Sequence, residues 1–201
     1  MVRKTKEEAE TTRRQIIDAA RRVFHECGVS RTSLEKIATA AGVTRGAVYW
    51  HFKNKTELFF AMRDEAKLPM VDRVVFDPCD ENPLGGIETA LREMVQVLID
   101  QPETRETFEI VSFKCEYVDE FALALQGNNC QMDFLDKLAA AYARAAEKGQ
   151  LRAGFAPEAL AHDTFLFVGG LIKHWLARMP DERFRQRAGD MIRAHVALRR
   201  A

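Results

Sequence analysis

Apolar residues recur along most of this chain at spacings of three and four, the pattern of helices with one buried face. The first stripe runs from Ile16 to Cys27 and ends at Gly28, and Thr5 with Glu8 is placed to cap its helix. Further stripes predict helices at residues 87–98, 104–113, 121–149 and 181–198, a helix that opens at Pro157, and a loop at residues 77–86. The pattern therefore predicts an all-α protein of about nine helices.

Residues 32–58 predict two short helices joined by a tight turn. Thr32 is expected to cap the first helix, with Glu35 three positions later completing a capping box. Gly42 supplies the turn, because glycine adopts backbone conformations that other residues avoid. Thr44 is expected to cap the second helix. This layout is typical of a helix-turn-helix.

The second helix of this pair has two different faces. Val48 and Phe52 are four positions apart and are expected to point inward. That leaves Tyr49 and Trp50 outward, with Arg45 at the N-terminal end. An aromatic and basic outer face suits a helix that contacts phosphates and base edges of DNA.

A further helix is expected to follow without a flexible linker. Asn54 and Glu57 are placed to cap its start directly after Phe52. Pro69 falls inside this helix and removes one of its hydrogen bonds. Two interpretations stay open: the helix ends or bends at Pro69 for packing, or Pro69 is a hinge between two sites.

The net charge of the chain is zero, but the charge is unevenly distributed. Residues 1–55 hold 12 lysines and arginines against 6 aspartates and glutamates, whereas residues 56–201 hold 18 against 24. A basic N-terminal part on an acidic body is expected of a DNA-binding domain joined to a domain with another role. We therefore predict a DNA-binding domain at residues 1–55 and a second domain at residues 56–201.

Other classes of protein are disfavoured. No stretch approaches the roughly 18 apolar residues that span a bilayer, and the charged N-terminus lacks the apolar region of a secretory signal, so we expect a cytoplasmic protein without a membrane partner. The cysteines form no C-x-x-C pair and predict neither a metal site nor a disulfide framework; they are Cys27, Cys79, Cys115 and Cys130. No catalytic or nucleotide-binding motif is present, so we expect no enzyme activity and no cofactor.

A motif carries a family resemblance. T-x-G-x-x-Y-x-H-F-x-x-K-x-x-L at residues 44–58 resembles the signature of the TetR family of bacterial transcriptional regulators. The opening 29 residues, the run AVYWHFKNK and KCEY at residues 114–117 resemble the AcrR-like repressors of multidrug efflux pumps. The resemblance is strong over about the first 60 residues and patchy beyond them.

The DNA-binding residues combine chemistry with this resemblance. Arg45 is our candidate for a base edge, because a guanidinium binds guanine O6 and N7 together. The resemblance implies phosphate contacts for Tyr49, His51 and Lys55. Trp50 is expected on a sugar or a thymine methyl, with packing against the next helix as the alternative; His51 has support of the fold as its alternative. The resemblance also implies hydroxyl or helix-end contacts for Thr32, Ser33 and Thr44, and Gly46 is expected to let the backbone approach the DNA closely.

The second domain has more aromatic and methionine side chains than a compact core requires. For each one, an ordinary core position is an equal alternative. The resemblance implies an open apolar pocket among them for a small apolar or aromatic effector. The candidate effector-binding residues are Phe76, Leu91, Met94, Phe108, Val111, Ser112, Met132, Leu135, Phe165, Val168, Gly169 and Lys173.

The helix that opens at Pro157 is apolar nearly all round, so it needs burial on two sides. A second subunit on one side meets that need, and four helices, two from each chain, would form the interface. The resemblance implies the same homodimer. The candidate interface residues are Phe167, Leu171, His174, Trp175, Phe184, Met191 and His195.

These observations predict a ligand-responsive homodimeric repressor that binds a near-palindromic double-stranded operator and controls an efflux-pump operon. Three alternatives stay open. The first two are regulators of the same fold that sense a metabolite, such as an acyl thioester, or an oxidant through a cysteine. The third is a nucleoid-type DNA-binding protein without an effector.

Overall fold

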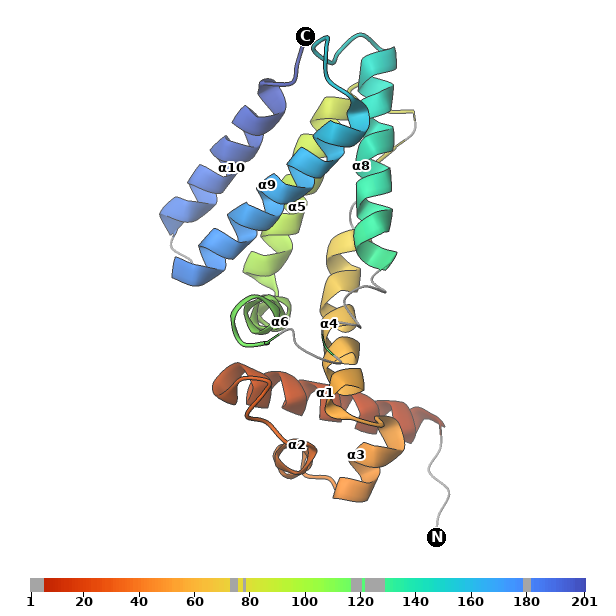
Figure 1. The fold of residues 1–201 in the computed structure, drawn as a ribbon, viewed down its shortest axis with the longest axis vertical. Coiled ribbons are helices and arrows are strands. Elements are labelled where there is room, and N and C mark those ends of the chain that lie inside the picture. Colours follow the sequence, from red (N-terminus) through yellow and green to blue (C-terminus); the bar gives the residue numbers. More distant parts are fainter. Residues whose placement is uncertain (1–5, 73–75, 78, 117–120, 122–128, 179–181) are drawn as a thin grey trace. The chain divides into compact units, whose positions relative to one another are not determined.

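The computed structural model describes the chain except for residues 1–5, 73–75, 78, 117–120, 122–128 and 179–181. Figure 1 labels the helices α1 (Lys6–Cys27), α2 (Leu34–Ala41), α3 (Arg45–His51), α4 (Lys55–Asp72), α5 (Pro83–Asp100), α6 (Pro102–Phe113), α8 (Asn129–Glu147), α9 (Pro157–Arg178) and α10 (Glu182–Ala197). In this described part of the chain the predicted all-α class is confirmed. Leu151 and Arg200 form an isolated antiparallel β-bridge there. None of these helices combines the length and the apolar character that a membrane span requires.

Several predicted helix boundaries need correction. Helix α5 begins at Pro83, inside the predicted loop, because the Asn82 side chain accepts a hydrogen bond from the Gly85 amide and caps the helix. Helix α6 begins two residues earlier than predicted, at Pro102. Helix α4 continues through Pro69 to Asp72 instead of ending at the proline. The predicted cap at Thr5 lies outside the described residues.

The chain packs as two units. Unit 1 comprises residues 1–68 and 102–126, and unit 2 comprises residues 69–101 and 127–201. Unit 1 thus contains α1, α2, α3, most of α4, and α6. Helix α6 belongs by its packing with the N-terminal helices, although nearly 50 residues separate it in sequence from the predicted domain boundary at residue 55.

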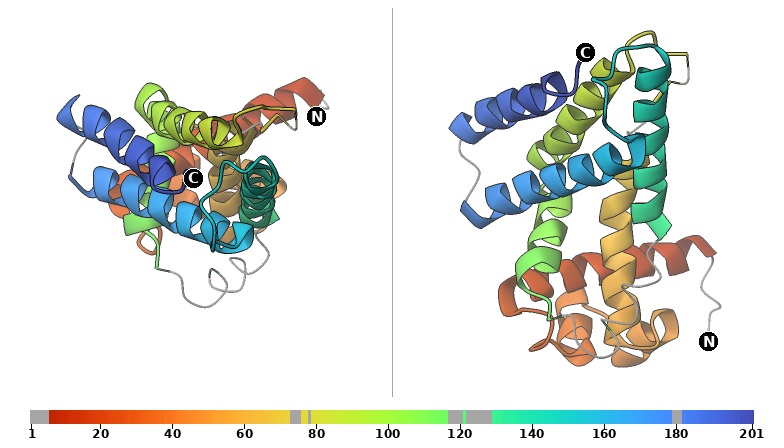
Figure 2. Two further views of the ribbon diagram at one scale, coloured as in Figure 1. Left: turned by 90° about the horizontal axis from the view of Figure 1, so that it is seen from above. Right: turned by 45° about the horizontal axis from the view of Figure 1, so that its top comes forward.

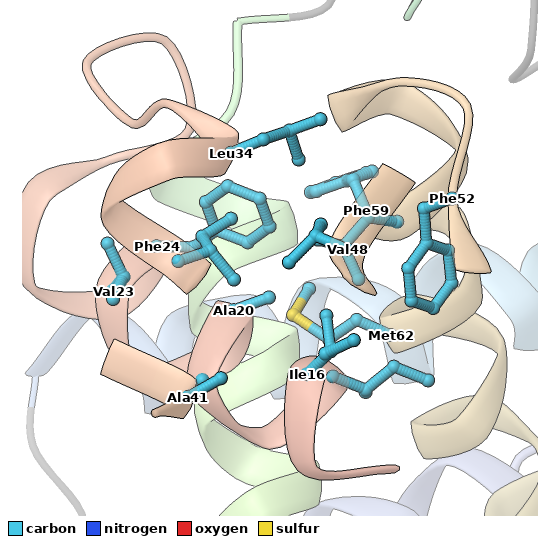
Figure 3. Close-up of a cluster of buried hydrophobic side chains, with 14 of the residues drawn as sticks. Ile16, Ala20, Val23, Phe24, Leu34, Ala41, Val48, Phe52, Phe59 and Met62 are labelled. Carbon is cyan, nitrogen blue, oxygen red and sulfur yellow. The ribbon is translucent and has the colours of Figure 1, made fainter. Parts of the chain in front are cut away.

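The core of unit 1 draws buried residues from α1, α2, α3, α4 and α6, and Figure 3 shows part of this cluster. Both residues predicted to point inward are buried: Val48 of α3 is 0 % and Phe52, directly after α3, is 2 % exposed. Around them lie Ile16, Ala20 and Phe24 of α1 and Phe59 and Met62 of α4. Burial of this apolar surface fixes the orientation of α3 and leaves Arg45, Gly46, Tyr49 and Trp50 exposed.

Unit 2 is a bundle of α5, α8, α9 and α10, in which α8 packs on α9 and α5 packs on both α8 and α10 (Figures 1 and 2). A buried chain of hydrogen bonds links three of these helices. The Tyr142 hydroxyl lies 2.7 Å from Thr164 Oγ1, which lies 3.0 Å from His195 Nε2. Because each of these three side chains has a polar partner, the bundle buries them without leaving their groups unsatisfied.

Candidate nucleic-acid interface

The start of α2 is capped by Ser33, one residue later than predicted. The Ser33 hydroxyl accepts a hydrogen bond of 3.2 Å from the Lys36 amide. Thr32 is instead buried, 3 % exposed, and its hydroxyl donates to the Gly28 carbonyl at 2.8 Å. The Thr32 side chain therefore faces the protein and is removed from the candidate DNA contacts, whereas Ser33 is exposed at the helix end.

The turn between α2 and α3 follows the prediction. Gly42 has a φ of 67°, in the left-handed region that favours glycine, and its amide bonds the last turn of α2. Thr44 caps α3, because its hydroxyl accepts a hydrogen bond of 3.2 Å from the Ala47 amide. The N-terminal end of α3, with Gly46 beside the cap, is exposed. A helix end of this kind presents free amide groups to an anion.

The outer face of α3 is aromatic and basic, as predicted. Trp50 is 72 % and Tyr49 is 44 % exposed, which is unusual for side chains of this size. The Trp50 ring meets His51 edge-on, with 4.5 Å between the ring centroids. Trp50 is therefore open to solvent, and His51 is half-buried behind it.

Arg45 is held by two neighbours on this face. Its Nη2 lies 3.1 Å from Glu35 Oε1 of α2, and its guanidinium lies 5.3 Å from the centroid of the Tyr49 ring. The hydrogen bond to Tyr49 and the charge of Glu35 raise the pKa of Arg45. The pKa of Glu35 is lowered, first by backbone hydrogen bonding and next by the Ser33 hydroxyl, with Arg45 adding a smaller effect. The contact of Arg45 with a base edge stays a prediction, and it would require the guanidinium to leave Glu35.

Lys55 is placed differently from the predicted phosphate contact. Its ammonium donates to the carbonyl oxygens of Val29 at 2.8 Å and Ser30 at 3.3 Å, in the α1–α2 loop. Partial burial lowers the pKa of this ammonium, and Cys115 lies close enough to oppose that effect. Lys55 therefore fastens the start of α4 to the loop that precedes α2.

Sequence reasoning missed other exposed cations on this surface. Lys36 of α2, Lys53 before α4 and Arg31 in the α1–α2 loop are exposed. Arg31 Nε donates to the Cys27 carbonyl, which leaves the rest of its guanidinium outward. These three cations lie within three residues of the helix caps at Ser33 and Asn54 in the sequence, and that spacing could have predicted them on this surface.

Polar contacts join α6 to α1 within unit 1. Buried Arg21 Nε donates to Thr107 Oγ1 at 3.2 Å, and His25 Nε2 lies 2.7 Å from Glu109 Oε2. Beyond α6, the Lys114 carbonyl accepts from the Val29 amide at 2.9 Å. Helix α6 is thus bonded to the same loop that Lys55 holds.

Comparisons with known proteins agree with this geometry. Residues 16–62 match the model for bacterial regulatory proteins of the tetR family. The chain is similar to the HTH-type transcriptional regulator TtgR of Pseudomonas putida, with 38 % identity over 100 % of both sequences. The chain belongs to the TetR family. Its function as a transcriptional regulator follows from this membership.

Solved TetR-family structures extend the likeness to the fold. The crystal structure of NalD, the secondary repressor of the MexAB-OprM multidrug efflux pump in Pseudomonas aeruginosa, matches with a TM-score of 0.82 and 34 % identity. That match covers 96 % of this chain and 97 % of NalD. A complex of SmeT, a repressor from Stenotrophomonas maltophilia, with triclosan matches with a TM-score of 0.77 and 32 % identity, over 92 % and 90 % of the two chains.

The predicted effector residues of this TetR-family chain divide between the units. In unit 1, Phe108, Val111 and Ser112 of α6 are half-buried. In unit 2, Leu91, Met94, Leu135 and Val168 are buried core residues, Phe76 and Phe165 are half-buried, and Met132, Gly169 and Lys173 are exposed. A methyl group added at Gly169 or Gly170 would meet no neighbouring atom within 4 Å, so close packing does not explain this pair. The assignment of these residues to one pocket stays a prediction.

The predicted dimer residues need partial correction. Trp175 (2 % exposed), Leu171 (5 %) and His195 (9 %) are buried within the chain itself, so their surfaces are already covered. The Phe167 ring stacks on His195, with 3.9 Å between centroids. His174 and Met191 are exposed, and the Phe184 side chain lies outside the described part. Leu166 and Leu198, apolar residues outside the list of candidate interface residues, are 70 % and 68 % exposed. A helical stripe indicates that a residue is apolar but not which part of the structure covers it.

Two described cysteines have polar surroundings. Cys27 Sγ lies 2.8 Å from the Lys36 ammonium. Cys115 lines a hollow of about 380 Å³ beside Phe113 and Lys114. Burial raises the pKa of the Cys115 thiol to about 11. Because the thiolate is the reactive form, Cys115 is a poor nucleophile at neutral pH.

Proposed function

We propose that this TetR-family regulator represses an efflux-pump operon as a homodimer and is released from its operator by small apolar or aromatic compounds. The observation that carries this proposal is the exposed Arg45–Tyr49–Trp50 face of a capped, core-anchored α3, in a chain whose full-length relatives are named as efflux repressors. The face supplies the contacts for a base edge and the flanking backbone. The site of action would be the cytoplasm, where the operator lies.

The dimer is supported by the exposed apolar side chains of unit 2. Leu166 of α9 and Met191 of α10 are exposed, and Leu198 lies directly after α10. On α9 the exposed face also includes Gly169 and Gly170, which are small enough for a second helix to approach closely. Exposed large apolar side chains are typical of association surfaces. Two copies joined here would present two α3 helices to successive major grooves, so the operator should be nearly palindromic.

The effector would act by preferring one conformation of the protein. A ligand shifts an equilibrium only by its differential affinity, so the compound must bind the DNA-free form more tightly than the DNA-bound form. Aromatic side chains such as Phe165 of unit 2 suit flat apolar compounds. The complex of SmeT with triclosan is an example of such a compound on a relative.

Footprinting of the DNA upstream of the gene for this protein, with and without a panel of antibiotics and dyes, tests the proposal. We expect a protected near-palindrome whose protection is lost when a member of the panel is added. Protection that no compound changes would contradict the drug-responsive part. Binding without sequence preference would contradict the operator and favour a nucleoid-type protein, whereas release by acyl thioesters alone would favour a metabolite sensor.

An oxidant sensor is the second candidate, and Cys27 favours it. Cys27 is only half-buried, and its sulfur accepts a hydrogen bond of 2.8 Å from the Lys36 ammonium. If an oxidant releases the operator, Cys27→Ser should abolish that response, and Cys115→Ser should leave it intact. A drug response that survives in both variants would support the proposed function.

A further inference from the structure

Arg63 of α4 is a charged side chain deep in unit 1. Only 7 % of the side chain is exposed. Its Nε and Nη2 both approach Asp64 Oδ1, at 2.9 and 2.8 Å. The ion pair therefore occupies one edge of the planar guanidinium.

The opposite edge of Arg63 is only partly bonded within the described part of the chain. Nη1 is buried, and no hydrogen-bond acceptor among the described residues meets it. A guanidinium has five N–H donors, and the Nη1–Nη2 edge, like the Nε–Nη2 edge, can bind an anion through two N–H groups. Buried donors without acceptors are rare in folded proteins and cost free energy, so this one needs an explanation.

One aromatic ring lies against this guanidinium, and a second ring lies near the first. The Arg63 guanidinium lies 4.3 Å from the centroid of the Phe60 ring. The Phe60 ring in turn lies 6.2 Å from Phe121, and both rings are half-buried. Stacking on a ring uses the flat face of a guanidinium and leaves its in-plane N–H groups free.

A second arginine in unit 1 provides a contrast. Arg13 lies 5.3 Å from the centroid of Phe52 and pairs with Glu65 at 3.2 Å. Its side chain is 34 % exposed, so water can meet its remaining donors. Arg63 has the same two kinds of partner but lacks that access to solvent.

We propose that Arg63 is an effector contact that accepts an aromatic compound with a negatively charged or acidic oxygen, such as a phenol or an aryl carboxylate. The oxygen would bind the Nη1–Nη2 edge, and the ring would pack against Phe60 and Phe121. This inference rests on the proposed function, in which the chain binds small aromatic effectors, and it adds their chemical class. Arg63 selects for the oxygen, because a neutral ring without it leaves the buried donor unpaired.

Paired compounds test the selection. Triclosan and 1-naphthol, each compared with its own methyl ether, differ in the hydroxyl proton and one methyl group. We expect the full chain, without DNA, to bind each phenol roughly 10- to 100-fold more tightly than its ether in calorimetric titrations, the range for a hydrogen bond to a charged group. Arg63→Met should bring that ratio close to one, and the matched variant Arg13→Met should leave it unchanged.

A spectroscopic measurement on the unmodified chain does not depend on whether Arg63→Met folds. A nearby guanidinium favours the ionised phenol, so the phenolate absorbance of bound triclosan should appear at lower pH than that of free triclosan. An unchanged or raised phenol pKa, equal binding of phenols and ethers, or a ratio preserved in Arg63→Met would each overturn the inference. The last result would indicate that water satisfies Arg63. If antibiotics or dyes release the operator while phenols show no preference, the inference alone fails; if no compound binds, the proposed function fails as well.

Discussion

Replacing Lys55 by methionine distinguishes a structural role from a phosphate contact. Loss of a structural bond lowers the stability of the protein, whereas loss of a phosphate contact changes the salt dependence of DNA binding. The structure bonds its ammonium to the carbonyl oxygens of Val29 and Ser30, at 2.8 and 3.3 Å. The family resemblance instead implies a phosphate contact. Methionine keeps most of the aliphatic length of the side chain and removes the charge and the donors.

The size of the effect follows from these two bonds. A hydrogen bond to a charged group contributes about 1.5–3 kcal/mol when it is buried. The bond to Val29 is partly buried, whereas the longer bond to Ser30 is exposed and contributes little. We therefore expect Lys55→Met to lower the free energy of unfolding by roughly 1–2 kcal/mol.

Urea unfolding and salt-dependent operator binding are the two assays. A lost phosphate contact reduces the slope of log affinity against log salt by about one for each half-site. Lys53→Met is the matched control, because Lys53 is exposed two residues away. We expect Lys55→Met to lower stability with an unchanged slope, and Lys53→Met to reduce the slope with unchanged stability. A reduced slope at full stability in Lys55→Met would refute the structural role.

Four further outcomes are expected. Arg45→Ala should cost about 1–3 kcal/mol at the operator and relax specificity at one base pair, as measured by binding to a set of operator variants; uniform weakening would make Arg45 a phosphate contact. Glu35→Gln should strengthen DNA binding by roughly two- to fivefold at low salt, because Arg45 then has no ion pair with residue 35 to break when it turns to the DNA. Equal affinities of the variant and the unmodified protein in a mobility-shift titration would count against this. Burial is the main cause that lowers the pKa of His195 to about 4, so the unfolded chain takes up this proton at a higher pH than the folded chain does, and stability should fall as the pH drops from about 6.5 to 4. His195→Gln should remove this part of the pH dependence from unfolding curves; an unchanged pH dependence in the variant would contradict the prediction. Leu166→Lys with Leu198→Lys should convert the dimer to a monomer in analytical ultracentrifugation while thermal unfolding of the helices persists; a dimer that remains would place the interface elsewhere.

Local chemistry made the helix-turn-helix predictable. The turn at Gly42, the cap at Thr44 and the inward positions of Val48 and Phe52 depend on neighbours within a few residues, and the structure confirms them. The first cap was misplaced by one residue because Thr32 and Ser33 are both good capping residues. Tertiary structure decides between them, since the Gly28 carbonyl engages the Thr32 hydroxyl.

Long-range placement was not available from the pattern. Lys55 was expected to face DNA, but its direction is set by carbonyl groups 25 and 26 residues earlier in the chain. Trp175 and His195 were expected at a subunit interface, because an apolar stripe predicts burial without naming the surface that provides it. The sequence gives no indication that the Nη1 donor of Arg63 is buried without an acceptor among the described residues, because that depends on which residues enclose the guanidinium.

The membership of α6 in unit 1 changes how this regulator can be recombined with its relatives. Ile110 of α6 is fully buried in the same core as Phe24 and Phe59, and Thr107 bonds buried Arg21. A graft of residues 1–55 onto another family member would therefore place a foreign α6 against this core. An operator-specificity swap that keeps its stability needs two segments, residues 1–68 and 102–126, exchanged together. For a protein engineer, the transferable DNA-reading module is discontinuous in the gene.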